Sequence, residues 1–163
     1  MKYSPKDGFP YYQQLAGDSD CFMLFSSLTN FNFLHSIPEE KASYRYAPGK
    51  WSIKQVVGHI TDHERIKMAR AFFLSRQQPV ELWGYDQVSL VNNSRFDALS
   101  YTDLLTDLEN VRRASISFIS ALSDDQLQLK GMAKGYEITL AQFLQSIIGH
   151  EIHHINVIRE KYL

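Results

Sequence analysis

Two histidines near the C-terminus are spaced as metal ligands on a helix. The run His150-Glu151-Ile152-His153-His154 fits the pattern H-E-x-x-H. Side chains four residues apart lie on one face of a helix, so the rings of His150 and His154 can reach one cation. Both positions also continue an apolar stripe, and a buried neutral imidazole needs a donor and an acceptor partner. The spacing therefore indicates metal ligation, and the alternative is a pair of hydrogen-bonded core histidines.

The position of this run argues against a zinc peptidase. Peptidases with this motif use its glutamate as general base, and their third ligand comes from downstream. Residues 155–163 contain no histidine and one carboxylate, Glu160, so we expect the third ligand earlier in the chain. Glu151 lies about 100° from the metal-facing side of the helix. It is either a catalytic base or a residue in a surface ion pair or hydrogen bond.

A second pair of histidines, His59 and His63, has the same spacing and also falls on an apolar helical face. One of them would complete a three-histidine site, and both would give four ligands. Catalytic zinc-type sites have three protein ligands and an open position, but the residues alone leave the choice between His59 and His63 open. Asp62 is either an acceptor that orients a ligand imidazole or part of a solvated helix face.

Glu64 continues the apolar stripe of its helix, so it either points into the protein or lies where the stripe reaches the surface. A buried carboxylate must be paired or protonated. Arg65, Arg70 or a ligand imidazole could be its partner, and Glu64 joins Glu151 as a candidate catalytic carboxylate. His153 is expected at the surface or beside a ligand, and His35 at an ordinary helix end.

Composition predicts a globular protein of one domain that spans residues 1–163. Of the 163 residues, 44% are hydrophobic and 13% aromatic, enough to bury a core. The net charge of −1 predicts no general attraction to nucleic acid or to an anionic membrane. Cys21, the only cysteine, lies in an apolar run and is expected in the core. With neither a signal peptide nor a membrane span, a cytoplasmic location is expected.

The chain is expected to be all-α, with four helices packed as a bundle. Ser52 with Gln55, and Thr139 with Gln142, have capping-box spacing and predict two helix starts. A long connection over residues 77–99 predicts a crossover between the second and third helices, and residues 131–137 could form an extended strand. The four helices are expected over residues 18–35, 52–76, 100–122 and 139–163.

Two segments resemble one protein family. The segment APGKWSIKQVVGHI at residues 47–60 is similar to the second-helix signature of the DinB-like four-helix-bundle proteins, and GHEIHHI at residues 149–155 is similar to their last-helix signature. The resemblance covers essentially the whole chain. It implies an up-down-down-up helix order with a long second connection, and it implies frequent homodimers.

The resemblance also implies a site and an activity. One divalent transition metal, nickel or zinc, would be held by His59, His150 and His154, which places His59 ahead of the alternate His63. The implied function is a metal-dependent enzyme acting on a small molecule, either a hydrolase or an S-transferase that uses a low-molecular-weight thiol. The alternative is a non-catalytic, metal-stabilised bundle that dimerises as a structural or sensing module. Residues 82–86 would either line the entrance or anchor the loop.

Overall fold

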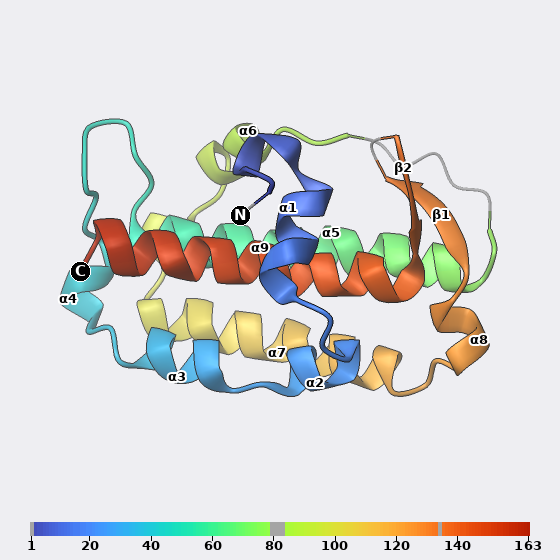
Figure 1. Ribbon diagram of the computed structural model, residues 1–163. Helices are drawn as coiled ribbons and strands as arrows, with labels where there is room; N and C mark the ends of the chain where they lie inside the picture. The colour runs from blue at the N-terminus through green and yellow to red at the C-terminus, as the bar shows by residue number, and fades with distance from the viewer. Residues whose placement is uncertain (1, 79–83, 134) are drawn as a thin grey trace.

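Four helical rods lie lengthwise beside one another in the computed structural model, which describes residues 2–78, 84–133 and 135–163 (Figure 1). In Figure 1, α5 and α7 run from left to right, whereas α9 and the rod formed by α2 and α3 run from right to left. These elements are α2 (Cys21–Ser26), α3 (Thr29–His35), α5 (Ile53–Ser75), α7 (Tyr101–Ile119) and α9 (Leu140–Lys161).

Side-chain caps set the starts of the long helices α5 and α9. The Ser52 hydroxyl accepts a hydrogen bond from the amide of Gln55, and the Gln55 side chain accepts one from the amide of Ser52. Thr139 and Gln142 form the same reciprocal pair at the start of α9. Each box satisfies two amides that a helix N-terminus leaves without partners. The predicted starts of these two helices are confirmed.

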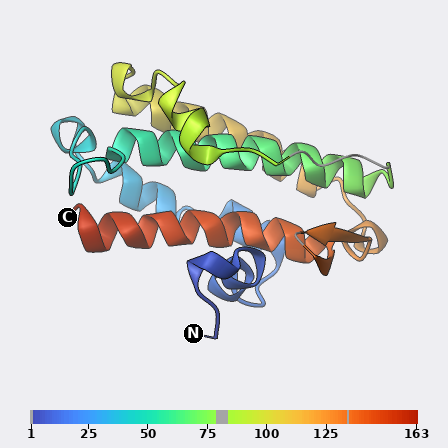
Figure 2. The same cartoon turned by 90° about the horizontal axis from the view of Figure 1, so that it is seen from above.

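The first predicted helix, over residues 18–35, is wrong as a single element. It is broken between α2 and α3, where Ser27 has an extended backbone and its hydroxyl accepts a hydrogen bond from the amide of Thr29. Local serine hydrogen bonds of this kind compete with helical ones. The prediction also missed α1 (Phe9–Ala16), which packs on the outer side of α9, away from α5 (Figure 2).

The connections contain short elements of their own. Residues 77–99 were expected as a loop but include α6 (Gln87–Asn92) and the 3-10 turn η2 (Phe96–Ala98). The expected strand near residues 131–137 is present as an antiparallel hairpin in which Lys130 pairs with Thr139. The remaining elements are η1 (Pro5–Asp7), α4 (Glu39–Ala42), α8 (Asp124–Leu127), β1 (Lys130–Ala133) and β2 (Tyr136–Thr139).

Two hydrophobic clusters fill the interior between the rods. One lies around Ile60, Leu108 and Ile155, and the other lies around Phe25 and Leu144. Cys21 is buried in the second cluster, as expected. Among the described residues, no helix combines the length and apolar character that a bilayer crossing needs. The clusters hold α5 and α9 together, and these two helices carry five of the six histidines.

Candidate metal centre

Three histidines from two helices converge at one point. His59 comes from α5, and His150 and His154 come from α9. The Nε2 atom of His150 lies 3.1 Å from the Nε2 atom of His59 and 3.1 Å from that of His154. One ligand atom of each residue lies within 4.8 Å of the other two. The structure therefore brings together the three residues of the implied ligand set.

Hydrogen bonds alone do not satisfy this arrangement. The Nε2 atom of a neutral imidazole carries either one proton or one lone pair, so that of His150 can make only one well-directed bond to its two neighbours. A cation accepts all three lone pairs at once. Ligand nitrogens about 2.0–2.1 Å from a metal lie roughly 2.9–3.4 Å from one another in octahedral or tetrahedral geometry. The 3.1 Å separations fit that range.

The three rings are held in the neutral form that metal ligation requires. His59 is 2% exposed and His150 is 3% exposed. Burial, followed by the effect of His153, lowers the pKa of His59 to about 4. Burial and the neighbouring histidines lower the pKa values of His150 and His154 well below the ordinary value. Because the charged form is disfavoured, the lone pairs stay available at neutral pH.

His63, the alternate ligand, lies beside the cluster. Its ring stacks on that of His150 with a centroid separation of 3.6 Å, and the described group of converging ligand atoms does not include it. His153 is half-buried, and its Nδ1 atom shares a hydrogen bond of 3.1 Å with the hydroxyl of Tyr11. His35 ends α3, as expected, and contacts Glu109 at 2.6 Å.

Two glycines allow other segments to pack against the cluster. A Cβ atom at Gly149 would lie 1.8 Å from the carbonyl oxygen of Tyr12, so α1 can approach α9 this closely only over a glycine. The Tyr12 ring then lies 5.1 Å from that of His150. A Cβ atom at Gly58 would lie 2.5 Å from the Phe96 ring. Each glycine directly precedes a histidine of the cluster.

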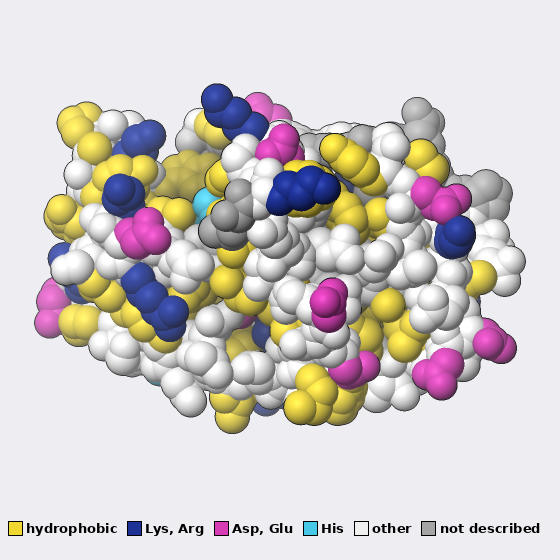
Figure 3. Space-filling model, in the orientation of Figure 1, with side chains coloured by type: hydrophobic (Ala, Val, Ile, Leu, Met, Phe, Trp, Pro, Cys, Tyr) yellow, Lys and Arg dark blue, Asp and Glu magenta, His cyan; other side chains and the backbone are white. Residues whose placement is uncertain are grey.

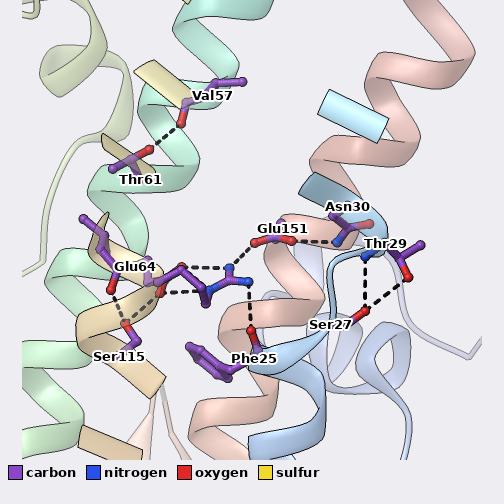
Figure 4. Close-up of polar contacts among 11 residues, drawn as sticks. Phe25, Ser27, Thr29, Asn30, Val57, Thr61, Glu64, Ser115 and Glu151 are labelled. Atoms are coloured by element: carbon purple, nitrogen blue, oxygen red, sulfur yellow. Dashed lines mark hydrogen bonds and ion pairs between the residues drawn. The ribbon is translucent and has the colours of Figure 1, made fainter. Parts of the chain in front are cut away.

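Both candidate carboxylates lie in a buried ionic network (Figure 4). The Arg112 guanidinium donates to Glu64 at 2.9 Å and also to Glu151. Ser115 donates to Glu64 at 2.7 Å, and Asn30 donates to Glu151 at 2.6 Å. Burial alone would lower the pKa of Arg112, but Glu151 and Glu64 outweigh it and raise that pKa. The network joins α5, α7, α9 and α3.

This network corrects two expectations. Glu64 does point inward, but its partner is Arg112 instead of Arg65 or Arg70. Arg65 instead contacts Asp62 at 3.4 Å and also Asp107. Glu151 forms the expected ion pair, but in the interior instead of at the surface, because α3 and α7 cover its side of α9.

The sequence analysis did not identify Arg112 and Ser115 as partners of the candidate carboxylates, although the sequence contains one signal for them. Arg112 and Ser115 occupy positions in the apolar stripe of α7 that includes Leu108 and Ile119. A charged residue on such a stripe needs a buried partner. The sequence pattern can indicate that need, but it does not identify the partner on another helix. The catalytic roles considered for Glu64 and Glu151 stay predictions.

The partly exposed Asp62 contacts Arg65, which agrees with the solvated-face alternative.

A cavity of about 650 Å³ reaches the histidines, and its wall includes His63 and His150. From the loop expected at the entrance, Tyr85 and Asp86 also line the cavity; Leu82 and Trp83 lie outside the described residues. Figure 3 shows histidine atoms, in cyan, on the floor of a recess on the face that carries α9.

Comparisons with known proteins agree with this description. A solved structure of YfiT from Bacillus subtilis, described as a probable metal-dependent hydrolase with an unusual four-helix bundle topology, matches with a TM-score of 0.71 and 17% identity. The match covers 98% of this chain and 89% of that chain, and it shows a shared fold. No curated protein sequence matches significantly. The family model of the DinB superfamily matches residues 30–158, which include all three histidines of the cluster, and the chain belongs to that superfamily.

Proposed function

We propose that this protein is a metal-dependent enzyme that holds one divalent transition metal, nickel or zinc, through His59, His150 and His154. The observation that carries the proposal is the convergence of three neutral imidazoles: the Nε2 atoms of His59 and His154 each lie 3.1 Å from that of His150, and ligand atoms of all three lie within 4.8 Å of one another. The shared fold with YfiT, described as a probable metal-dependent hydrolase, supports the same class of activity. The substrate is a small molecule.

The proposed reaction is hydrolysis or transfer to a low-molecular-weight thiol. A metal bound by the three imidazoles would lower the pKa of a coordinated water or thiol and supply a nucleophile at neutral pH. The chain contributes three uncharged ligands, so it does not neutralise the cation. His150 lies in the cavity wall, so a substrate would reach the site from that side. Burial of the His59 and His150 rings keeps bulk water from competing for them.

Metal content tests the ligand set. Elemental analysis of protein purified without an affinity tag should find one metal ion per chain. His59→Ala, His150→Ala and His154→Ala should each lose it, and His63→Ala is the matched control that should keep it. Stoichiometric metal in His150→Ala would contradict the assignment. Loss of metal in His63→Ala would indicate a closed four-ligand site and favour the non-catalytic structural or sensing module.

An activity screen separates the two reaction branches. The metal-loaded protein would be assayed against small esters and amides, and against small thiols paired with electrophiles. Turnover in one set that is absent in His150→Ala assigns the branch. A metal-loaded protein inactive in both sets would favour the non-catalytic alternative.

We further propose a single-domain cytoplasmic protein that forms homodimers. The helix directions in Figure 1 support an up-down-down-up order with its crossover between α5 and α7. Light scattering coupled to size-exclusion chromatography measures the mass in solution. A monomer at all micromolar concentrations would contradict the dimer.

A further inference from the structure

Both carboxylates of the buried ionic network directly follow histidines that contact each other. Glu151 follows His150 on α9, and its side chain pairs with Arg112 of α7 (Figure 4). Glu64 follows His63 on α5 and pairs with the same guanidinium. The rings of the two histidines stack with their centroids 3.6 Å apart. At two successive residues, α5 and α9 are therefore linked first by a ring contact and then by a shared cation.

Contacts from several helices fix the position of Arg112. Its Nε atom donates to both carboxylate oxygens of Glu64 at 3.2 Å, and its Nη2 atom donates to Glu64 at 2.9 Å and also to Glu151. The guanidinium lies 5.2 Å from the ring centroids of Phe25 and Phe31, which belong to α2 and α3. The donors of a guanidinium point in fixed directions in one plane. Arg112 therefore determines the direction in which each carboxylate points from its helix.

Stability alone does not explain a charged group at this position. The side chains of Arg112, Glu64 and Glu151 are 4%, 1% and 4% exposed. Replacing a whole buried ionic group by uncharged residues of similar size is often neutral or stabilising. A buried ionic group does favour one arrangement of the helices that carry it, because another arrangement leaves a charge unpaired. The arrangement favoured here is the one in which the histidines converge.

The direction of a carboxylate is coupled to the rotation of its helix. Successive side chains are 100° apart around a helix, so fixing Glu151 also fixes the direction of His150. Side-chain atoms lie about 5–6 Å from the helix axis, so a rotation of about 10° moves them by about 1 Å. Metal–ligand distances vary by about 0.2 Å. A rotation of that size would move the His150 ring too far to share one cation with His59.

We propose that Arg112 is a positioning residue for the metal centre. By pairing with Glu64 and Glu151, it fixes the rotation of α5 and α9. It thereby holds the ring nitrogens of His59 and His150 at the separation that one cation requires. The inference rests on the metal site of the proposed function, and it assigns the two carboxylates to the support of that site instead of to proton transfer.

A neutral version of the network separates positioning from stability. Arg112→Met, Glu64→Gln and Glu151→Gln in one chain remove all three charges of the network, so none of them is left unpaired. The folded triple variant should bind Zn²⁺ about tenfold or more weakly than the wild type, the usual effect of losing residues that support metal ligands. Competition with a chelator measures the Kd, and circular dichroism measures folding. A folded triple variant with the wild-type Kd overturns the inference.

Lys54→Met is the matched control. Lys54 is a second buried cation on α5, and its partners are Glu39 and the carbonyl of Leu99, neither of which belongs to α9. The variant loses a buried ion pair but keeps the link to α9, so its Kd for Zn²⁺ should stay within about twofold of the wild type, as for independent sites. A Kd raised as much as in the triple variant would show a general effect of lower stability and would overturn the positioning role.

Cobalt(II) in place of zinc reports the ligand geometry. Its visible absorption is strong in four-coordinate sites and weak in six-coordinate sites, so it responds to a displaced imidazole. At saturating Co²⁺, the spectrum of the triple variant should differ from that of the wild type, and the spectrum of Lys54→Met should not. Identical spectra in the triple variant and the wild type would show undisturbed ligands and overturn the inference.

Glu151→Gln decides the question if the triple variant does not fold. Glutamine keeps the shape of the side chain but loses the charge through which Arg112 holds α9. The Kd for Zn²⁺ should again rise about tenfold. Unchanged zinc binding overturns the positioning role, and unchanged binding combined with lost activity would assign Glu151 to proton transfer instead.

The wild-type protein distinguishes the failure of this inference from that of the proposed function. A wild type that binds neither Zn²⁺ nor Co²⁺ overturns the metal centre, and the positioning role with it. A wild type that binds the metal, together with a folded triple variant that binds it equally well, overturns the positioning role alone.

Discussion

Replacing Arg112 by methionine should destabilise the protein more than any surface substitution. The guanidinium is 4% exposed and is the cation between Glu64 and Glu151, whose side chains are 1% and 4% exposed. In the variant, the partners that the carboxylates keep among the described residues are the hydroxyl of Ser115 and the amide of Asn30. Removing one member of a buried ionic group leaves the remaining charge uncompensated.

The expected loss is about 3–5 kcal/mol in the free energy of unfolding, the usual effect of breaking a buried ion pair. A loss of that size is a large part of the stability of a typical domain.

Urea unfolding followed by circular dichroism measures the difference between variants. Arg113→Met is the matched control, because Arg113 is the exposed neighbour on the same helix and should change stability by about 0.5 kcal/mol or less. Adding Glu64→Gln and Glu151→Gln to Arg112→Met should recover part of the loss, since no unpaired charge then remains. If Arg112→Met loses no more stability than Arg113→Met, the assignment of this network as a buried structural element is refuted.

Two further predictions concern the histidine cluster. Gly149→Ala should cost about 1–3 kcal/mol, as overpacking does, because its Cβ meets the backbone of Tyr12; Gly58→Ala should cost less, because the ring of Phe96 can move. Thermal unfolding compares the two, and the reverse order would contradict the packing described. The metal-free protein should lose stability between pH 7 and pH 5. The folded pKa of His59 is about 4, below its unfolded value, so the unfolded state binds more protons as the pH falls, and His59 alone contributes about 2 kcal/mol. Constant stability over that range would show that the rings are not buried in neutral form.

The sequence was sufficient to predict the parts of the fold that depend on local chemistry. Capping residues determine where α5 and α9 begin, and i, i+4 spacing places His150 and His154 on one face. These signals act within about one helical turn, so they are visible in the chain itself. The convergence of His59 with the pair on α9 followed only from the resemblance to a family.

The features that were missed depend on contacts between distant segments. α1 has eight residues and no side-chain cap, so an isolated segment of this kind would barely form a helix, and packing on α9 accounts for it. The break at Ser27 was missed because the segments on both sides of it are strongly apolar. Arg112 is 48 residues from Glu64, and no local pattern distinguishes it from Arg65 or Arg70 as the partner.

Gly149 has a consequence for comparisons among relatives. The family match begins at residue 30, so α1 lies outside it, yet the Tyr12 carbonyl occupies the space where any other residue at position 149 would place a side chain. A superfamily member with a larger residue at this position cannot seat an N-terminal helix in the same place. The residue directly before the first histidine of the last helix is therefore a sequence marker. It indicates which relatives can place an N-terminal helix over the site as α1 is placed here.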